Sequence, residues 1–314
     1  MLIMAISAVL FTCSGSGGGI YATIEREVKL NNRSVVNIVN RMCQFGSNLY
    51  SCNGSLNTKG AGAGAGWTQV PVEGVQGRII SVAADNSYLY VLAVTSESET
   101  SDSYIGTCTV YYSANGSTFT STGLSGTSTS SSGCWLFDNK AKDSANRQAF
   151  FNNGSGGTFQ LAGATFSSIG VNAKGAAFWG GATHFHSSEA ITANTDETAG
   201  WTSAYPENLV TDDKNNHPWE NNVKALTFFA SGSNTYLFVG FDSNHNNGGY
   251  TPFNLATGHS DTSLTNPSQG GFSGSEIKFL RNINGVIYMS VYMQPSSRTG
   301  LWAYYPGSAG WNIE

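Results

Sequence analysis

Pairs of apolar runs joined by short turn sequences recur along this chain, and they constrain its fold more than any other feature. The clearest pairs occupy residues 79–95, 223–242 and 277–294, where IISVAADN leads into SYLYVLAVT, VKALTFFASG into NTYLFVGFD and IKFLRNING into VIYMSVYMQ. Runs rich in β-branched and aromatic residues on either side of an Asn, Asp or Gly turn are typical of β-hairpins. From about Ser34 onward the sequence therefore predicts short strands, and no convincing amphipathic helix interrupts them.

The hairpins return with a period of about 40–55 residues, which leaves room for four strands in each repeat. Each repeat closes on a turn and an aromatic residue among polar ones, in the motifs GWTQV, STFTS, ATFSS, GWTSA and GWNIE that begin at Gly66, Ser117, Ala164, Gly200 and Gly310. Four-stranded repeats of this length are typical of β-propeller blades. We expect an all-β fold, a β-propeller of six four-stranded blades, with repeats at 33–75, 76–124, 125–170, 171–219, 220–272 and 273–314. Five or seven blades and a pair of β-sandwiches are the alternatives.

The composition restricts the classes of function. Charged residues make up 11% of the 314 residues, the formal net charge is −5 and the isoelectric point is near 5.5. No basic patch with interleaved aromatic residues occurs, so we expect no binding of nucleic acid. Aromatic residues reach 12%, which argues against disorder because disordered chains lack the apolar surface that offsets the entropy of ordering.

The first residues, MLIMAISAVLF, form an uncharged apolar run. Its length suits a secretory signal and is too short for a membrane-spanning helix, which needs about 20 apolar residues. No Lys or Arg precedes the run, so we expect translation to start upstream of Met1. We expect residues 1–12 to be a signal peptide, 13–32 a flexible tether whose segment 20–30 is a candidate ring-closing strand, and 33–314 a single propeller domain. The alternative is a buried N-terminal strand.

The order Leu10-Phe11-Thr12-Cys13 resembles the lipobox of bacterial lipoproteins, although that family usually has Gly, Ala or Ser where Thr12 stands. Relaxed boxes of this kind are familiar in spirochaete lipoproteins. The resemblance implies that Cys13 is diacylated and becomes the new N-terminus. It also implies a membrane partner through the lipid and a place in the bacterial cell envelope, at the outer membrane surface or facing the periplasm.

Five cysteines are present, and reserving Cys13 for lipid leaves four. An even set in an exported chain predicts disulfides, because export leads to an oxidising compartment. We expect bridges Cys43–Cys52 and Cys108–Cys134, one of three connectivities. The alternative is that all four are buried free thiols.

The segment Tyr112 to Phe119, YSANGSTF, resembles a relaxed Asp-box, the turn between outer strands of sialidase-like propellers; weaker echoes occur at 194–201 and 306–311. The resemblance implies a fold and carries no activity. Sialidase chemistry would need three converging arginines, and we expect the candidates to lie by chance on blade surfaces: Arg33, Arg41, Arg78, Arg147, Arg281 and Arg298.

Other reactive residues do not form a readable site. The carboxylates Asp138, Glu189, Asp212 and Asp242 cannot be paired from sequence, as glycoside hydrolysis would require. His184 and His186 would share one strand face, but no third metal ligand lies nearby. The oxygen-rich segments 211–222 and 242–249 lack calcium-loop spacing and are interpreted as solvated loops. We therefore predict no catalytic residue, no cofactor and no metal.

The expected function is binding, adhesion or envelope scaffolding through one loop-bearing face, with a protein or glycan ligand that the sequence does not identify. Long polar loops such as 96–104 and 211–222 would supply that face. The segments 60–66 and 123–133 are expected to be flexible loop insertions. The rival hypothesis is a glycan-acting hydrolase, and the oligomeric state stays open.

Overall fold

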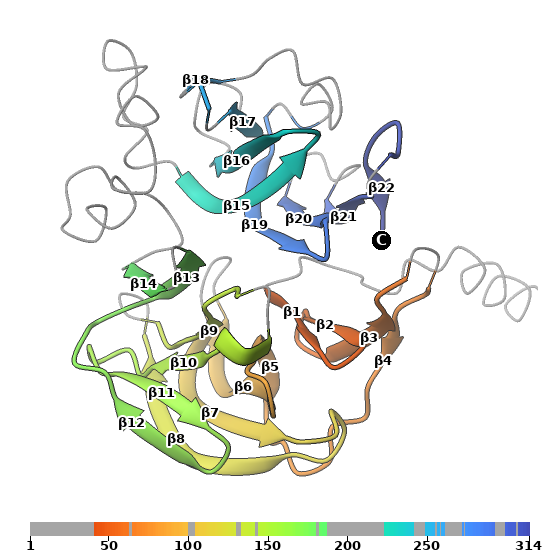
Figure 1. Ribbon diagram of the computed structural model, residues 1–314. Coiled ribbons are helices and arrows are strands. Elements are labelled where there is room, and N and C mark those ends of the chain that lie inside the picture. The colour runs from red at the N-terminus through yellow and green to blue at the C-terminus, as the bar shows by residue number, and fades with distance from the viewer. Residues whose placement is uncertain are drawn as a thin grey trace, which may run out of the picture.

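The fold is given by a computed structural model (Figure 1), which describes residues 41–62, 65–99, 104–129, 133–141, 144–179, 182–186, 223–241, 249–254, 256–257, 259–260, 272, 274–292, 299–305 and 307–314. The predicted signal peptide, Cys13 and the candidate strand at 20–30 lie outside these ranges. Within them, no helix is long and apolar enough to cross a membrane.

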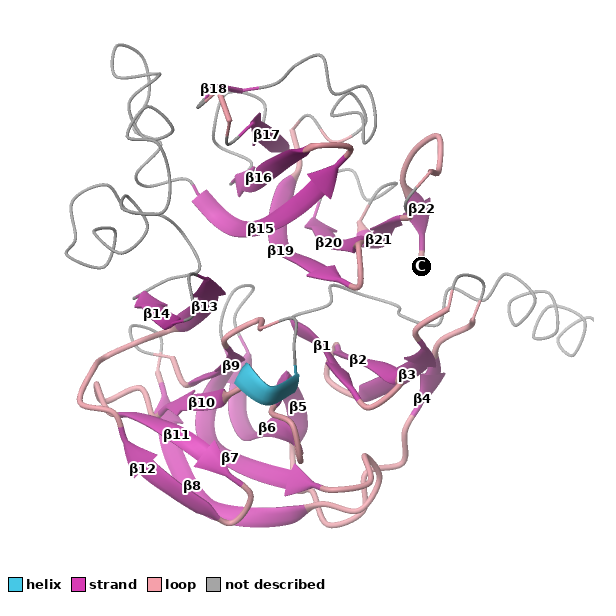
Figure 2. Ribbon diagram, in the orientation of Figure 1, coloured by secondary structure: helices cyan, strands magenta, loops and turns pink. Residues whose placement is uncertain are grey.

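The described residues form antiparallel sheets, five with four strands and one with two (Figure 2). The expected all-β class is confirmed. In chain order the sheets are β1–β4 (Arg41–Phe45, Asn48–Cys52, Leu56–Gly60, Thr68–Gln69), β5–β8 (Arg78–Ala84, Leu89–Glu99, Tyr104–Ser113, Thr120–Ser128), β9–β12 (Trp135–Asp138, Ala149–Asn152, Thr158–Ala162, Thr165–Ser168), β13–β14 (Gly175–Trp179, Ala182–His186), β15–β18 (Val223–Ser231, Asn234–Phe241, Tyr250–Asn254, His259–Ser260) and β19–β22 (Glu276–Ile283, Val286–Tyr292, Gly300–Tyr304, Asn312–Ile313). A 3-10 turn, η1, covers Ser144–Asn146.

The three predicted hairpins are confirmed as β5–β6, β15–β16 and β19–β20. The last of them closes with Ile283 paired to Val286 around a two-residue turn, Asn284-Gly285. Both turn residues have positive φ, 54° and 85°. This conformation suits Asn and Gly, and it gives the turn the twist that its flanking strands require.

Each sheet meets its neighbours through its first strand. β19 contacts β1, β1 contacts β5, β5 contacts β9 and β9 contacts β13, while β15 contacts β19. Figure 1 shows these first strands turned toward the middle of the molecule. Successive four-stranded meanders that join through their first strands have the arrangement of β-propeller blades. Residues 187–222, between β14 and β15, lie outside the described part of the chain.

The core is made between neighbouring sheets, and strand β6 shows how. All residues from Leu89 to Val94 are buried. Leu89, Val91 and Ala93 pack with residues of the first sheet, whereas Tyr90, Leu92 and Val94 pack with residues of the third. Because successive side chains of a strand point to opposite faces, a strand between two sheets must be apolar at every position. This explains why the strongest runs in the sequence are continuous and do not alternate.

The turn after β7, in the segment that resembles an Asp-box, is held by hydrogen bonds between side chains and the main chain. Asn115 Oδ1 accepts the N–H groups of Ser117 and Thr118, both at 3.0 Å, and Ser113 Oγ accepts the N–H of Gly116 at 2.8 Å. The aromatic residue that follows, Phe119, is buried with residues of the first two sheets. The echo at 194–201 lies outside the described residues.

Two local expectations were wrong. The segment 123–133, expected to be a loop insertion, begins as a strand. Strand β8 continues to Ser128 and pairs with β7, where Gly126 lies opposite Cys108. Leu124 enters the core, and a side chain at Gly126 would meet the carbonyl oxygen of Asn153 at 2.4 Å. The segment 96–104, expected to be a long polar loop, is strand at both of its ends, because β6 continues to Glu99 and β7 begins at Tyr104, with which Glu99 pairs.

Candidate functional site

A polar cavity of about 210 Å³ lies where the ends of three first strands meet. Gln44 comes from the end of β1, Lys140 and Arg147 from the connection between β9 and β10, and residues 281–285 from the end of β19. The sheets that supply them are far apart in sequence. The cavity therefore exists only because the repeats bring the ends of their first strands together.

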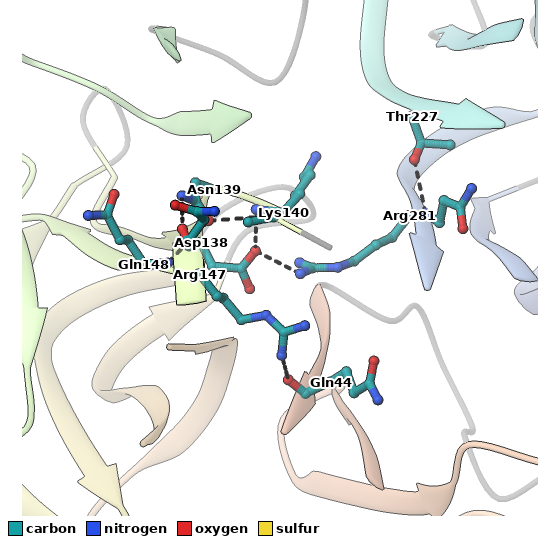
Figure 3. Close-up of polar contacts among 11 residues, drawn as sticks. Gln44, Asp138, Asn139, Lys140, Arg147, Gln148, Thr227 and Arg281 are labelled. Atoms are coloured by element: carbon teal, nitrogen blue, oxygen red, sulfur yellow. Dashed lines mark hydrogen bonds and ion pairs between the residues drawn. The ribbon is translucent and has the colours of Figure 1, made fainter. Parts of the chain in front are cut away.

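An ion pair forms one side of this site (Figure 3). Arg281 Nη2 lies 2.7 Å from Asp138 Oδ1, and the Asp138 side chain is fully buried while that of Arg281 is 10% exposed. The pair joins β9 to β19, although β1 and β5 lie between these two strands in the series of neighbouring first strands. Asp138 Oδ1 also accepts the N–H of Lys140 at 2.9 Å. A buried carboxylate needs such partners, because an unpaired charge is costly to bury.

Arg147 reaches across the cavity to the first sheet. Its Nη1 donates to the main-chain oxygen of Gln44 at 2.9 Å (Figure 3). Its Nε is buried and has no hydrogen-bond partner within the described residues. The Gln44 side chain accepts a hydrogen bond from Asn284 Nδ2 at 3.1 Å, which ties the first sheet to the β19–β20 hairpin.

The connection after β9 is held in place by Asn139, which is fully buried. Its Nδ2 donates to the oxygen of Asn146 at 2.8 Å and to Thr183 Oγ1 at 3.0 Å, and its Oδ1 accepts the N–H of Gln148 at 3.1 Å. Lys140 follows with φ of 54°, a conformation that costs energy in a residue other than Gly or Asn. The buried Asn139 thus fixes a strained turn that places Lys140 at the cavity.

The site is cationic. Lys140, Arg147 and Arg281 line it, together with the amides of Gln44, Asn282 and Asn284. None of the described lining residues is a carboxylate. Asp138 contacts the site through its pair with Arg281 and through the N–H of Lys140. All six arginines outside the first 32 residues were expected to lie by chance on blade surfaces. Two of them, Arg147 and Arg281, instead line the same cavity.

The four cysteines for which disulfides were predicted are buried free thiols in the structure: Cys43, Cys52, Cys108 and Cys134. Cys43 on β1 packs close enough to the cationic cluster that Asp138, Arg281 and Arg147 all affect its pKa. Burial is the main cause that raises this pKa, so the thiol stays protonated at neutral pH. Burial likewise raises the pKa of Cys52 to about 12. Neither thiol has the lowered pKa of a nucleophile.

The two predicted bridges differ in geometry. Cys43 pairs with Tyr50 and Cys52 with Arg41, so the two cysteines are diagonal neighbours across β1 and β2. Diagonal neighbours stand about 7–8 Å apart, beyond the usual disulfide range. Cys108 and Cys134 instead come from adjacent sheets, and their thiols hydrogen bond to each other, which lowers the pKa of Cys108. The Cys43–Cys52 bridge stays a prediction that the register disfavours.

The other candidates do not line the cavity or lie outside the described residues. His184 and His186 lie on β14, paired with Ala177 and Gly175. The carboxylates Glu189, Asp212 and Asp242 and the segment 211–222 lie outside the described residues. Within the described ranges, no group of three or more His, Cys, Asp or Glu side chains could hold a metal ion.

The described parts of the segment 96–104 are the end of β6, which runs to Glu99, and the start of β7 at Tyr104, and they lie at the opposite end of the sheets from the cavity. Gly54, in the turn between β2 and β3, forms an isolated bridge with Ile79 near the start of β5. The start of β5 is therefore at the end away from the β1–β2 hairpin and its cavity residue Gln44. The end of β6 and the start of β7 share that far end, because β6 runs antiparallel to β5 and β7 pairs with β6.

Comparison with solved structures supports the fold. The tricorn protease superposes with a TM-score of 0.50 at 12% identity, over 89% of this chain and 26% of that chain. This chain thus spans about a quarter of the protease chain. The SapL1 lectin, solved with alpha methyl fucoside, gives a TM-score of 0.44 at 10% identity over 90% of this chain and 96% of its own. An arabinanase from Bacillus subtilis gives 0.39 at 15% identity over 86% and 94%.

No curated protein matches the chain in sequence. A family model does match, over residues 1–166. The matched half begins at the apolar run and lipobox-like segment and extends through the first two sheets into β12. The family is described as a lipoprotein family, which agrees with lipid anchoring at a membrane. The chain belongs to the TP013X lipoprotein family.

Proposed function

We propose that this protein is a lipid-anchored binding module of the bacterial cell envelope. Cys13 carries the anchor, and a six-bladed propeller with degenerate Asp-box turns presents the cavity-bearing face to a ligand. The outer membrane surface is the location that an adhesion role would require.

The observation that carries the proposal is the polar cavity bounded by Gln44, Arg147 and Arg281. Its walls come from rigid strand ends and a two-residue turn, and hydrogen bonds from Arg147 and Asn284 to Gln44 link them. A concave site with a few convergent polar groups on a rigid scaffold is the usual form of a ligand site. This location supports the cavity end of the sheets as the binding face, whereas the end of β6 and the start of β7 lie at the other end.

A glycan-acting hydrolase is the second candidate. Asp138 is the one carboxylate near the cavity within the described residues, and its Oδ1 is already occupied by Arg281 and by the N–H of Lys140. Glycoside hydrolysis needs two carboxylates that flank the substrate. The charge arrangement therefore favours binding over turnover.

The test uses the full-length protein in detergent micelles. Immobilised protein is screened against glycans and extracellular matrix proteins, and the captured ligand is re-measured with Arg147→Gln and with a variant that has glycine at residues 100–103. Weakened binding by Arg147→Gln alone supports the cavity face. Weakened binding by the 100–103 variant alone would move the site to the opposite end and contradict the proposal.

The hydrolase alternative is tested in parallel with fluorogenic glycosides. We expect no turnover. Turnover that disappears in folded Asp138→Asn protein that still binds the captured ligand would replace the binding function with a hydrolase, because Asp138 also holds the binding residue Arg281.

A further inference from the structure

We propose that the cavity between Gln44, Lys140, Arg147 and Arg281 recognises an anionic group, a carboxylate, sulfate or phosphate on a small ligand or on the end of a glycan. This inference rests on the proposed function, because it names the ligand chemistry of the same site. It comes from the balance of charge, the hydrogen-bond donors and the size of the cavity.

The charge balance is unusual for this chain. The protein as a whole carries a formal net charge of −5, with 15 Lys and Arg residues against 20 Asp and Glu residues. Three of those cations line this one cavity. Asp138 pairs with Arg281, and the lining itself adds no carboxylate among the described residues. A recess lined by charges of one sign raises the local concentration of ions of the opposite sign, here anions.

The donors point to an oxygen anion. Arg147 Nε is buried and lacks an acceptor within the described residues. The same guanidinium is held by its bond to the main-chain oxygen of Gln44, so its orientation is set before a ligand arrives. A planar guanidinium matches the oxygens of a carboxylate, sulfate or phosphate group, and such charge-assisted bonds are about twice as strong as neutral ones.

The room suits a group of this size. The cavity measures about 210 Å³, whereas one water needs only ~10–15 Å³ of such space. An anionic group and part of the ligand that carries it therefore fit. A cation is disfavoured, because the lining offers no carboxylate among the described residues.

The test titrates full-length protein in micelles with inorganic phosphate, sulfate, glucuronate and, as a neutral control, glucose. Ionic strength is held constant with sodium chloride, and binding is measured by calorimetry and by the shift in Tm. We expect saturable binding of at least one anion and none of glucose. Binding of glucuronate alone identifies a carboxylate ligand, and binding of phosphate or sulfate identifies a phosphorylated or sulfated one.

The variants locate the site. Arg147→Gln and Lys140→Gln should each raise the Kd for the bound anion about tenfold or more, which is the effect of losing one charge-assisted hydrogen bond. Arg78→Gln is the matched control, because Arg78 is exposed at the start of β5, away from the cavity; its Kd should change by less than about twofold. Equal weakening by all three variants would mean nonspecific charge attraction and would overturn the proposal.

The outcomes also separate this inference from the proposed function. If no anion binds but Arg147→Gln still abolishes capture of a macromolecular ligand, the anion inference fails and the binding face stands. If anions bind at the cavity but no macromolecule is captured, the anion site stands and the adhesion role fails. If neither happens, both proposals fail.

Discussion

Lys59 of β3 and Glu314, which follows β22, form a buried ion pair between the first and last sheets, with side-chain exposures of 1% and 8%. Lys59 Nζ also donates to the hydroxyl of Tyr305 at 3.1 Å, and Trp67 Nε1 donates to the Glu314 carboxylate at 3.2 Å. The rings of Trp67, Tyr288 and Tyr305 lie 5.4, 5.5 and 5.8 Å from the ammonium. An aromatic cage thus surrounds the charge and ties the two ends of the described fold together.

Removing the carboxylate from this pair should be strongly destabilising. Glu314→Gln leaves the Lys59 ammonium buried without its counter-charge, and breaking a buried pair in this way costs about 3–5 kcal/mol. Chemical denaturation of the variant measures the loss. Glu276→Gln is the matched control, because the Glu276–Lys278 pair is partly exposed, at 14% and 24%. It should lose no more than about 1 kcal/mol. Equal losses in both variants would contradict the special role of the buried pair.

Gly116 in the Asp-box-like turn should not tolerate a side chain. Its φ is +80°, and a Cβ there would lie 2.3 Å from the hydroxyl oxygen of Tyr50. Tyr50 is 5% exposed, so its ring has little freedom to move away. Gly123 has the same φ but no atom within 4 Å of its Cβ position. It therefore isolates the cost of backbone strain.

We expect Gly123→Ala to lose about 1–2 kcal/mol from strain alone. Gly116→Ala should lose about 1–3 kcal/mol more, because it adds overpacking. The free energy of unfolding of both variants, measured by urea titration, decides the point. If Gly116→Ala is no worse than Gly123→Ala, the turn does not pack on Tyr50 as described.

Cys108 and Cys134 should join under oxidising conditions, and Cys43 and Cys52 should not. The first two thiols hydrogen bond to each other, whereas the second two are diagonal across a strand pair. Oxidised glutathione would accept the two electrons and two protons that the paired thiols release. Thiol counting after treatment should find one pair lost, and Cys108→Ser should abolish that loss. The bridge should add about 3 kcal/mol of stability. Loss of all four thiols would show that Cys43 and Cys52 also react.

The strands could be predicted from sequence because each hairpin is local. The runs at 79–95 and 277–294 carry their own turn residues, and Asn284-Gly285 alone determines a tight turn. The cavity could not be predicted in the same way. More than one hundred residues separate Gln44 from Arg147, and again Arg147 from Arg281. No motif with a fixed spacing in the sequence links the three residues. Their contact depends on how the sheets sit beside one another.

A usable signal was nevertheless present. Gln44, Lys140 and Asn282 each fall at or just beyond the end of the first strand of a repeat. If the repeats are aligned on their first hairpins, polar residues at that position are expected to converge, because all first strands face the middle. The extension of β8 to Ser128 was missed for a different reason. Its Ser, Thr and Gly residues have the composition of a loop, and pairing with β7 overrides that local preference.

Lipid attachment at Cys13 predicts a simple partition experiment. A Cys13→Ser variant should lose the acyl chains and move from the detergent phase to the aqueous phase, because the hydrophobic contribution of the lipid is lost. Cys134→Ser is the control and should remain in the detergent phase. Metabolic labelling with palmitate should mark the parent protein and not the Cys13→Ser variant. A Cys13→Ser protein that still enters the detergent phase would show that another segment holds it at the membrane.

Alkaline pH should destabilise the fold through its buried thiols. Burial raises the pKa of Cys52 to about 12 and that of Cys43 further, from an ordinary value of 9.0. The folded state therefore keeps protons that the unfolded chain releases. This stabilising contribution is fully present below pH 9 and is lost as pH rises toward the folded-state pKa. Each such thiol should lower the free energy of unfolding by about 1.4 kcal/mol per pH unit above pH 9.

Urea denaturation between about pH 8 and 10 tests this prediction, and the tyrosines that begin to ionise in this window contribute equally to the parent protein and to a cysteine variant. The slope of unfolding free energy against pH, and not its absolute value, is the quantity to compare. Cys52→Ala should reduce that slope by the share of one thiol, whatever it does to stability at pH 8, because a methyl group releases no proton. Cys13→Ser, which changes a cysteine outside the described fold, should leave the slope unaltered. A Cys52→Ala slope identical to that of the parent protein would mean that this thiol already titrates normally in the folded state.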